Sequence, residues 1–431
     1  MNVNKVKPNG LALLPIIVFL ILFIGVGVVQ KDFYSMPAVI GFLIALAVAF
    51  LQTRGISFNE KISIIAKGVG DDNIITMCLI FLVAGAFSGS VSAAGGVNST
   101  VNLGLSLLPP GIAVIGLFII GCFISISMGT SMGTIAALAP IAMGISEKTD
   151  FPIAICIGAV VSGAMFGDNL SMISDTTIAA VRTQGCDMRD KFRKNFLIVL
   201  PAAIATIVIL FFMTSGAHFT VSKDLDYNIF QVIPYILVLV TALIGLNVFI
   251  VLIGGIAFSV IAGLATGAMK VSQIFTSMGE GATGMYDITV ISILVACISA
   301  LVKYNGGFAF ILENIHKHIH SYKGAEFGVA ALVGLIDCAT ANNTVAIVIA
   351  GPIAKEISDD YGIEPTRTAS LLDMFASVFQ GIIPYGAQLL SAASLTGLSS
   401  FDIMPYLFYP YLMAVCGIVS IIMSKKKLGK A

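Results

Sequence analysis

Apolar segments long enough to cross a lipid bilayer follow one another along this chain, and this pattern restricts its fold. The 431 residues are 58% hydrophobic and 11% charged, whereas soluble domains carry about a quarter charged residues. The segments lie at about 11–29, 36–53, 74–94, 111–146, 151–181 and 195–214, then at 229–245, 248–267, 285–303, 325–357, 366–396 and 404–424. We therefore expect an all-α polytopic membrane protein. No soluble nucleotide domain or catalytic motif accompanies these segments, which argues against an ATP-driven pump and against an enzyme.

The two sets of six segments repeat one rhythm. Three ordinary segments are followed by a double-length segment with a polar middle, a long segment with a polar interruption, and a final span. Residues 68–70 match 279–281, and residues 140–142 match 352–354, at a nearly constant offset. We therefore expect two transmembrane repeats, residues 1–220 and 221–431.

The double-length segments decide the topology. Each is either two crossing helices or a re-entrant hairpin. The tip of the first, residues 127–134, contains Thr130 and Ser131, and the tip of the second, residues 340–344, contains Asn342, Asn343 and Thr344. If both are hairpins, each half crosses the membrane five times, and this odd number inverts the second half relative to the first.

The distribution of positive charge favours the hairpins. With the N-terminus inside, all but four of the 23 Lys and Arg residues fall on the cytoplasmic side, the exceptions being Lys31, Lys148, Lys223 and Lys270. We predict about ten transmembrane helices plus two re-entrant hairpins, in two inverted-topology repeats with broken helices. The protein is expected in the cell inner membrane, multi-pass, with both termini cytoplasmic.

A polar run interrupts the fifth apolar segment. Residues 166–177 read FGDNLSMISDTT. Unpaired polar groups in hydrocarbon cost several kcal/mol, roughly, so this run is expected to face a cavity. A second interruption, at residues 384–388, aligns with residues 167–169 after a shift of about seven residues and carries no acid. In inverted repeats such breaks meet near the midplane.

Two acids in the first interruption suit a cation site. Carboxylate, hydroxyl and carbonyl oxygens bind Na⁺, and a carboxylate in a low dielectric also takes up H⁺. Competition of the two ions for Asp168 and Asp175, the expected metal ligands, gives antiport. The alternative for Asp175 is that it caps the following helix. The predicted ion- and substrate-binding residues are Thr130, Ser131, Asp168, Asn169, Ser171, Ser174, Asp175, Thr176, Asp337, Asn342, Asn343, Thr344 and Gln388.

Other charged residues have simpler interpretations. Asp337 precedes the second tip by three residues and suits a structural role as well as a functional one. Asp373 is a weaker functional candidate, for which the alternative is a pairing with Arg367 or with water. Lys191 lies in a basic cluster that we interpret as an orientation signal meeting anionic lipid, and no Lys or Arg is expected near the midplane.

The polar run also carries a family resemblance. Residues 167–177 resemble the motif G-D-x-x-S-x-x-S-D-T-T of the NhaC-type Na⁺/H⁺ antiporters, of the ion-transporter superfamily. The continuation, residues 178–186, is similar to a subgroup described as antiporters or amino-acid permeases. This resemblance extends over essentially the whole chain and implies cation-coupled secondary transport.

Two functional hypotheses follow. The first is Na⁺/H⁺ antiport with exchange at the midplane Asp residues. The alternative is a Na⁺- or H⁺-coupled permease for a small organic solute such as an amino acid, whose carboxylate Asn342 and Asn343 would hold. The expected partners are a small cation, in the alternative an organic solute, and the lipid bilayer. Na⁺ or H⁺ or both are the coupling ions. No cofactor and no nucleic acid are expected, and a homodimer is compatible with this organisation.

Overall fold

Helices account for all the regular elements in the part of the chain that the computed structural model describes. That part comprises residues 7–30, 36–107, 110–149, 151–172, 174–215, 225–244 and 246–424. The predicted sides of Lys31 and Lys223 concern residues outside these ranges. Within them there is no strand, so the predicted all-α class is confirmed.

In the described residues of the first half there are ten α-helices. They are α1 (Leu14–Gln30), α2 (Ala38–Gln52), α3 (Phe58–Val69), α4 (Asp72–Ala93), α5 (Gly96–Leu107), α6 (Pro110–Met128), α7 (Ser131–Thr149), α8 (Ile153–Leu170), α9 (Asp175–Gln184) and α10 (Met188–Ser215). Hydropathy predicted the long members of this set. It missed the twelve-residue helices α3 and α5, which are too short and too polar to stand out as spans.

The second half repeats this order. Its helices are α11 (Ile229–Leu243), α12 (Val248–Thr266), α13 (Ile274–Thr283), α14 (Tyr286–Tyr304), α15 (Gly307–His318), α16 (Tyr322–Thr340), α17 (Asn343–Tyr361), α18 (Pro365–Ile382), α19 (Ala387–Thr396), α20 (Ser400–Ile403) and α21 (Phe408–Ile422). Helices α6, α7, α16 and α17 all have 19 residues, α8 and α18 have 18, and α9 and α19 have 10. Each residue of α6–α9 therefore has a counterpart in α16–α19.

All four polar interruptions are breaks between helices, as predicted. Gly129 and Thr130 separate α6 from α7, and Ala341 and Asn342 separate α16 from α17. Gly129 and Ala341 have positive φ angles of 69° and 47°. The left-handed conformation is easy for glycine and strained for alanine, so the surrounding contacts must hold the second tip in place.

The seven-residue shift in our alignment of the two long breaks is wrong. Helix α8 ends at Leu170 and α18 at Ile382, whereas α9 begins at Asp175 and α19 at Ala387. Both breaks therefore keep the offset that relates the rest of the two halves. As a consequence, the counterpart of Asp168 is Gln380, and the counterpart of Asp175 is Ala387.

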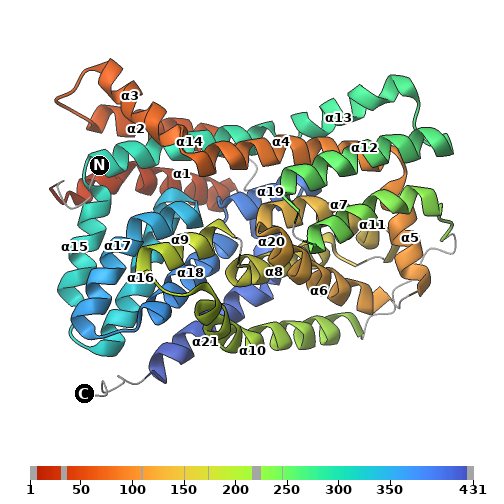
Figure 1. The fold of residues 1–431 in the computed structure, drawn as a ribbon. Coiled ribbons are helices and arrows are strands. Elements are labelled where there is room, and N and C mark those ends of the chain that lie inside the picture. Colours follow the sequence, from red (N-terminus) through yellow and green to blue (C-terminus); the bar gives the residue numbers. More distant parts are fainter. Residues whose placement is uncertain are drawn as a thin grey trace.

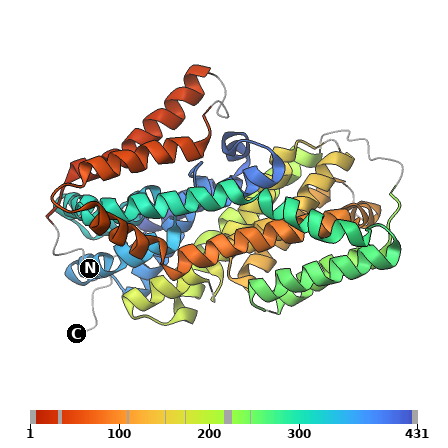
Figure 2. The same ribbon diagram turned by 90° about the horizontal axis from the view of Figure 1, so that it is seen from above.

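The helices after the breaks pack across the two halves. Helix α7 packs against α19, and α17 packs against α9. The same exchange occurs outside this core, where α4 lies along α13 and α14 lies along α3 (Figure 1, Figure 2). Each half therefore completes the surroundings of the other half's break.

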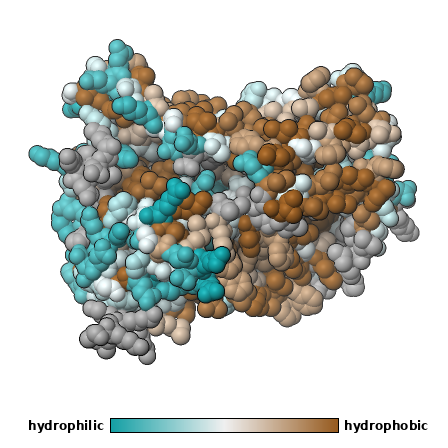
Figure 3. All heavy atoms as spheres, viewed as in Figure 1, coloured by the Kyte–Doolittle hydropathy of each residue, from teal (hydrophilic) through white to brown (hydrophobic). Residues whose placement is uncertain are grey.

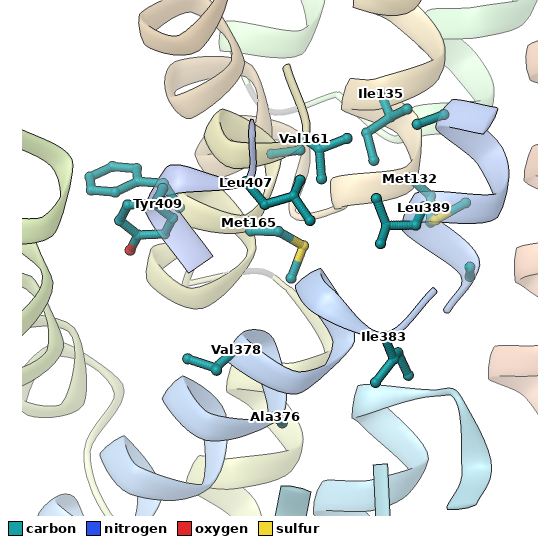
Figure 4. Close-up of a cluster of buried hydrophobic side chains, with 14 of the residues drawn as sticks. Met132, Ile135, Val161, Met165, Ala376, Val378, Ile383, Leu389, Leu407 and Tyr409 are labelled. Carbon is teal, nitrogen blue, oxygen red and sulfur yellow. The ribbon is translucent and has the colours of Figure 1, made fainter. Parts of the chain in front are cut away.

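Helix α8, which ends at the first break, packs closely against α6. An added Cβ at Gly163 would lie 2.4 Å from the Phe118 carbonyl oxygen, and one at Gly167 would lie 2.2 Å from Ser125 Cβ. Figure 4 shows the neighbouring apolar cluster, in which Val161 and Met165 of α8 pack with Leu407 beside α21. Lipid tails are as apolar as these side chains, so van der Waals contact rather than exclusion of water stabilises this packing.

The outer surface is that of a membrane protein. Four described helical stretches, Ile74–Ala93, Ile153–Gln184, Met188–Thr214 and Phe249–Thr266, are long and apolar enough to span a bilayer, and the number rises to six if two bent helix pairs each form one span. Hydrophobic residues cover much of the face in Figure 3, and hydrophilic residues gather at the end formed by α15–α17. The predicted number of ten spans and the hairpin topology remain predictions.

Candidate functional site

The four helix breaks surround one cavity of about 390 Å³. Its volume lies in the lower part of the range typical of small-molecule sites, roughly 300–1,000 Å³. Its polar lining consists of Thr76, Thr130, Ser131, Asp168, Asp175, Thr176, Asn247, Asn342, Asn343, Thr344, Gln380 and Gln388. Most of the predicted site residues therefore do converge.

Asp168 is the buried acid of this cavity. It lies near the C-terminal end of α8 and is 5% exposed. Its Oδ2 accepts a hydrogen bond from Ser131 Oγ at 3.1 Å and another from Asn343 Nδ2 at 3.2 Å. Ser131 begins α7 and Asn343 begins α17. Helix N-termini carry a positive partial charge, so the starts of α7 and α17 both favour negative charge at this carboxyl group.

A chain of side chains extends from Asp168 to the second long break. Gln388 Nε2 donates to Ser131 Oγ at 3.0 Å, and Gln380 Nε2 donates to Gln388 Oε1 at 2.6 Å. Gln380 also donates to the Ala341 carbonyl oxygen at 3.3 Å. Our sequence reasoning missed Gln380, because the seven-residue shift concealed that it corresponds to Asp168.

Asp175 is the first residue of α9 and lines the same cavity, but it is exposed. The alternative in which it caps α9 is wrong, because Ser174 is the cap: Ser174 Oγ accepts from the Thr177 amide at 3.3 Å. Ser174 Oγ also donates to the Asp168 carbonyl oxygen at 2.9 Å and lies 2.9 Å from Thr176 Oγ1. Asp175 is therefore free to contribute charge to the cavity.

Four predicted site residues lie outside the cavity lining, namely Asn169, Ser171, Ser174 and Asp337. Ser171 Oγ donates to the Ile126 carbonyl oxygen at 2.6 Å and so fastens the first break to α6. Asn169 faces away from the cavity, toward Asn195 of α10, whose Nδ2 donates to Asn169 Oδ1 at 2.9 Å. These residues support the shape of the break, and Asp337 occupies a separate buried position.

Lys191 is the main correction to the sequence analysis. Its side chain is buried and its Nζ forms an ion pair with Asp373. The same ammonium group donates to the Asn169 carbonyl oxygen and to Thr177 Oγ1, both at 2.8 Å. The prediction that it meets anionic lipid is therefore wrong, and the ammonium group lies beside Asn169, one of the predicted site residues. The signal that could have found it is its spacing of four residues from Asn195, which places both on one helix face.

The alternative pairing of Asp373 with Arg367 is also wrong. Arg367 binds Glu326 instead, with Nε and Nη2 donating to the two carboxylate oxygens at 2.8 and 3.2 Å. Buried carboxylates are retained when they are paired.

In the described part of the chain no group of three or more His, Cys, Asp and Glu residues could hold a metal ion. A Na⁺ site here would therefore combine one or two carboxylates with neutral oxygens.

The chain is similar in sequence to known antiporters. The model of the Na⁺/H⁺ antiporter family matches residues 9–215 and 227–425. The malate-2H⁺/Na⁺-lactate antiporter of Bacillus subtilis is 23% identical over 435 residues, which cover 93% of this chain and 92% of the relative. The Na⁺/H⁺ antiporter NhaC of Bacillus subtilis is 23% identical over 413 residues, 87% of this chain and 90% of the relative.

A relative with a different printed cargo has a similar degree of identity. The arginine/ornithine antiporter ArcD of Halobacterium salinarum is 24% identical over 452 residues, which cover 95% of this chain and 91% of the relative. The resemblance inferred from residues 167–177 is confirmed, because the family model covers nearly the whole chain. This chain belongs to the Na⁺/H⁺ antiporter family.

Proposed function

We propose that the protein exchanges Na⁺ for H⁺ at Asp168. The observation that carries this proposal is the state of the buried acids, which are Asp168, Glu326, Asp337 and Asp373 in the described residues. Glu326 and Asp373 have permanent cationic partners, Arg367 and Lys191. Asp168 lines a cavity and has only neutral hydrogen-bond donors. Its charge is therefore available to a mobile cation or a proton.

The surroundings of Asp168 suit both ions. Na⁺ prefers hard oxygen ligands, and the carboxylate lies beside the hydroxyl of Ser131, with the hydroxyls of Thr130 and Thr176 on the same cavity wall. Asp175 adds a second negative charge to that wall. Because Na⁺ and H⁺ bind the same carboxylate oxygens, one ion excludes the other, and the site carries them in alternation.

Transport then requires the site to face each side of the membrane in turn. As a member of the family, the protein is an integral, multi-pass membrane protein. We place about ten spans and two re-entrant hairpins in it, with residues 1–220 and 221–431 as inverted repeats in the inner membrane and both termini in the cytoplasm. The common helix order of the two halves and their cross-packing support this arrangement, as does the distribution of Lys and Arg.

A second candidate function is the exchange of a small organic acid or amino acid coupled to a cation. The cavity volume of about 390 Å³ favours it, because a bare ion needs far less space. The amide side chains of Asn342, Asn343, Gln380 and Gln388 line the same cavity and could bind a carboxylate there. Two relatives have names that include lactate and malate, or arginine and ornithine.

Reconstitution in liposomes separates the two candidates. A Na⁺ gradient is imposed and internal pH is followed with and without malate, lactate, arginine or ornithine. A pH change without solute supports Na⁺/H⁺ antiport. If solute is taken up, and internal pH stays constant when no solute is added, the result supports the second candidate. Asp168→Asn should stop transport in both cases, whereas Asp359→Asn, at an exposed acid of α17, is the matched control. Full activity of Asp168→Asn would remove this residue from the mechanism.

A further inference from the structure

Asp337 is a second buried acid without a counterion. It lies in α16, one turn before the second tip, and is 0% exposed. Among the described residues neither of its carboxyl oxygens has a hydrogen-bond partner, and the backbone amide of Gln380 is the polar group close enough to act on it. Ser377 Oγ and Gln380 Oε1, one turn apart on α18, also lack partners. Asp337 of α16 and these two groups of α18, a helix that packs against α16, are therefore all buried without a hydrogen-bond partner in the described chain.

A proton on Asp337 resolves this arrangement. An ionised carboxylate buried without a counterion costs far more free energy than hydrogen bonds return, so such a group becomes neutral instead. A neutral carboxylic acid gains one O–H donor. That donor can serve Gln380 Oε1, an acceptor without a partner on the residue whose backbone lies against Asp337.

The titratable groups that face Asp337 in the described chain are the thiol of Cys338 and the hydroxyl of Tyr385. Tyr385 Oη donates to the Cys338 carbonyl oxygen at 2.7 Å. The charged residues of α18 are paired elsewhere, Arg367 with Glu326 and Asp373 with Lys191. Those of α14, α15 and α17 lie at helix ends or on exposed faces, and α21 has none within Phe408–Ile422. No fixed positive charge therefore holds Asp337 in its ionised form.

The cavity acid Asp168 and the unpaired acid Asp337 lie on helices that do not correspond to each other in the two halves. Asp337 corresponds to Ser125 in α6, whereas Gln380 corresponds to Asp168 in α8. In the first half the acid is therefore on the broken helix and its neutral counterpart is in the hairpin arm. In the second half the acid is in the hairpin arm and the neutral amide is on the broken helix.

Gln380 connects the two acids. Its side chain ends the chain of hydrogen bonds that runs from Asp168 through Ser131 and Gln388, and its backbone lies against Asp337. Ser131 donates to Asp168 and accepts from Gln388, so replacing the proton at Asp168 by an ion alters the hydrogen bonds that lead to Gln380. The environment of Asp337 therefore depends on what occupies Asp168.

We infer that Asp337 is a second proton-binding site, separate from the cation site, which loads and releases its proton in the same transport cycle. This inference rests on the proposed exchange at Asp168. In one direction both carboxyl groups carry a proton. On release, each O–H bond gives up one H⁺, Na⁺ binds the Asp168 carboxylate, and the Asp337 carboxylate is left beside the backbone amide of Gln380. Two H⁺ then move for each Na⁺, and one net charge crosses the membrane per cycle.

The balance of gradients in liposomes tests this stoichiometry. With the membrane potential clamped at zero, a Na⁺ gradient of about tenfold is balanced by about half a pH unit when two protons move, and by about one pH unit when one moves. We expect half a unit for the wild type and for Asp359→Asn. We expect one unit for Asp337→Asn, whose exchange should also lose its response to an imposed potential. One unit in the wild type, or half a unit in Asp337→Asn, would overturn the inference.

An infrared measurement covers the case in which Asp337→Asn does not transport. The wild type and Asp168→Asn should both show the carbonyl band of a buried protonated carboxylic acid that Asp337→Asn lacks. Identical spectra of the wild type and Asp337→Asn would overturn the inference. A different result would contradict the proposed exchange at Asp168, namely Na⁺/H⁺ exchange that persists in Asp168→Asn.

Discussion

The two long breaks lie between helices of the same lengths, but the first is acidic and the second is neutral. The break between α8 and α9 carries Asp168 and Asp175, whereas the break between α18 and α19 has Gln380 and Ala387 in their places. In the proposed mechanism the first binds the cation, and the second supplies the neutral amides of Gln380 and Gln388, which reach Asp168 through Ser131. The two breaks therefore share the same helix lengths, while only the first carries acidic side chains.

The largest effect on ion exchange is expected when the acid of the first break is neutralised. Asp168→Asn gives the first break the neutral character of the second and should abolish ion exchange, because a neutral amide cannot compensate the charge of Na⁺. Asp175→Asn should change the rate by only about fivefold or less, since interactions of exposed charges are weak. Na⁺-driven pH change in liposomes measures both. Equal losses in the two variants would contradict the distinction between the buried acid and the exposed one.

A large effect on stability is expected where a charge pair supports the first break. Lys191→Met leaves Asp373 buried without its partner, which should destabilise the protein by about 3–5 kcal/mol. The double variant Lys191→Met with Asp373→Leu should recover most of this loss, because no isolated charge remains. Thermal unfolding of the purified proteins checks the prediction. A double variant as unstable as the single one would show that Lys191 acts mainly through Asn169 and Thr177.

A moderate effect is expected from the neutral half. Gln388→Leu removes the donor to Ser131 Oγ while leaving Asp168 itself intact. Residues that orient a ligand typically contribute about 10–100-fold to ion affinity, so the half-saturating Na⁺ concentration should rise by about that factor. Ser106→Ala, at an exposed hydroxyl of α5, is the control. An unchanged affinity in Gln388→Leu would mean that the second break does not assist the first.

The smallest effect concerns the short helices outside the core. The cap of α3 uses an acid, with the Ser57 amide donating to Glu60 Oε2 at 2.7 Å, whereas the corresponding cap before α13 uses the neutral Gln273. The backbone and hydroxyl hydrogen bonds from Ser57 lower the pKa of Glu60 below 4.5. Its contribution to stability is therefore present above pH 4.5 and is lost as the pH falls through the lowered pKa.

Glu60→Gln checks this sign. The variant should unfold at nearly the same temperature as the wild type in acid and at a slightly lower temperature at neutral pH. A difference between the two proteins that grows on acidification would contradict the role of the ionised cap.

Much of this site could be predicted from residue types alone. Polar residues such as Thr130, Asp168 and Asn342 are costly in contact with lipid, so the sequence predicted that they face a common cavity. Lys191 could not be predicted, because a basic cluster normally lies at the membrane surface and only the packing of α10 against α18 makes this residue buried. The Arg367–Glu326 pair joins residues 41 positions apart, which no local pattern indicates.

Competition between Na⁺ and H⁺ for Asp168 is the central claim, and titration calorimetry of the purified protein tests it most directly. If the two ions share one carboxylate, the Na⁺ dissociation constant should rise about tenfold for each unit of acidification below the pH at which that group ionises, and binding should release protons. Asp168→Asn should show no Na⁺ binding. Na⁺ affinity that is independent of pH, or that survives in Asp168→Asn, would contradict the account.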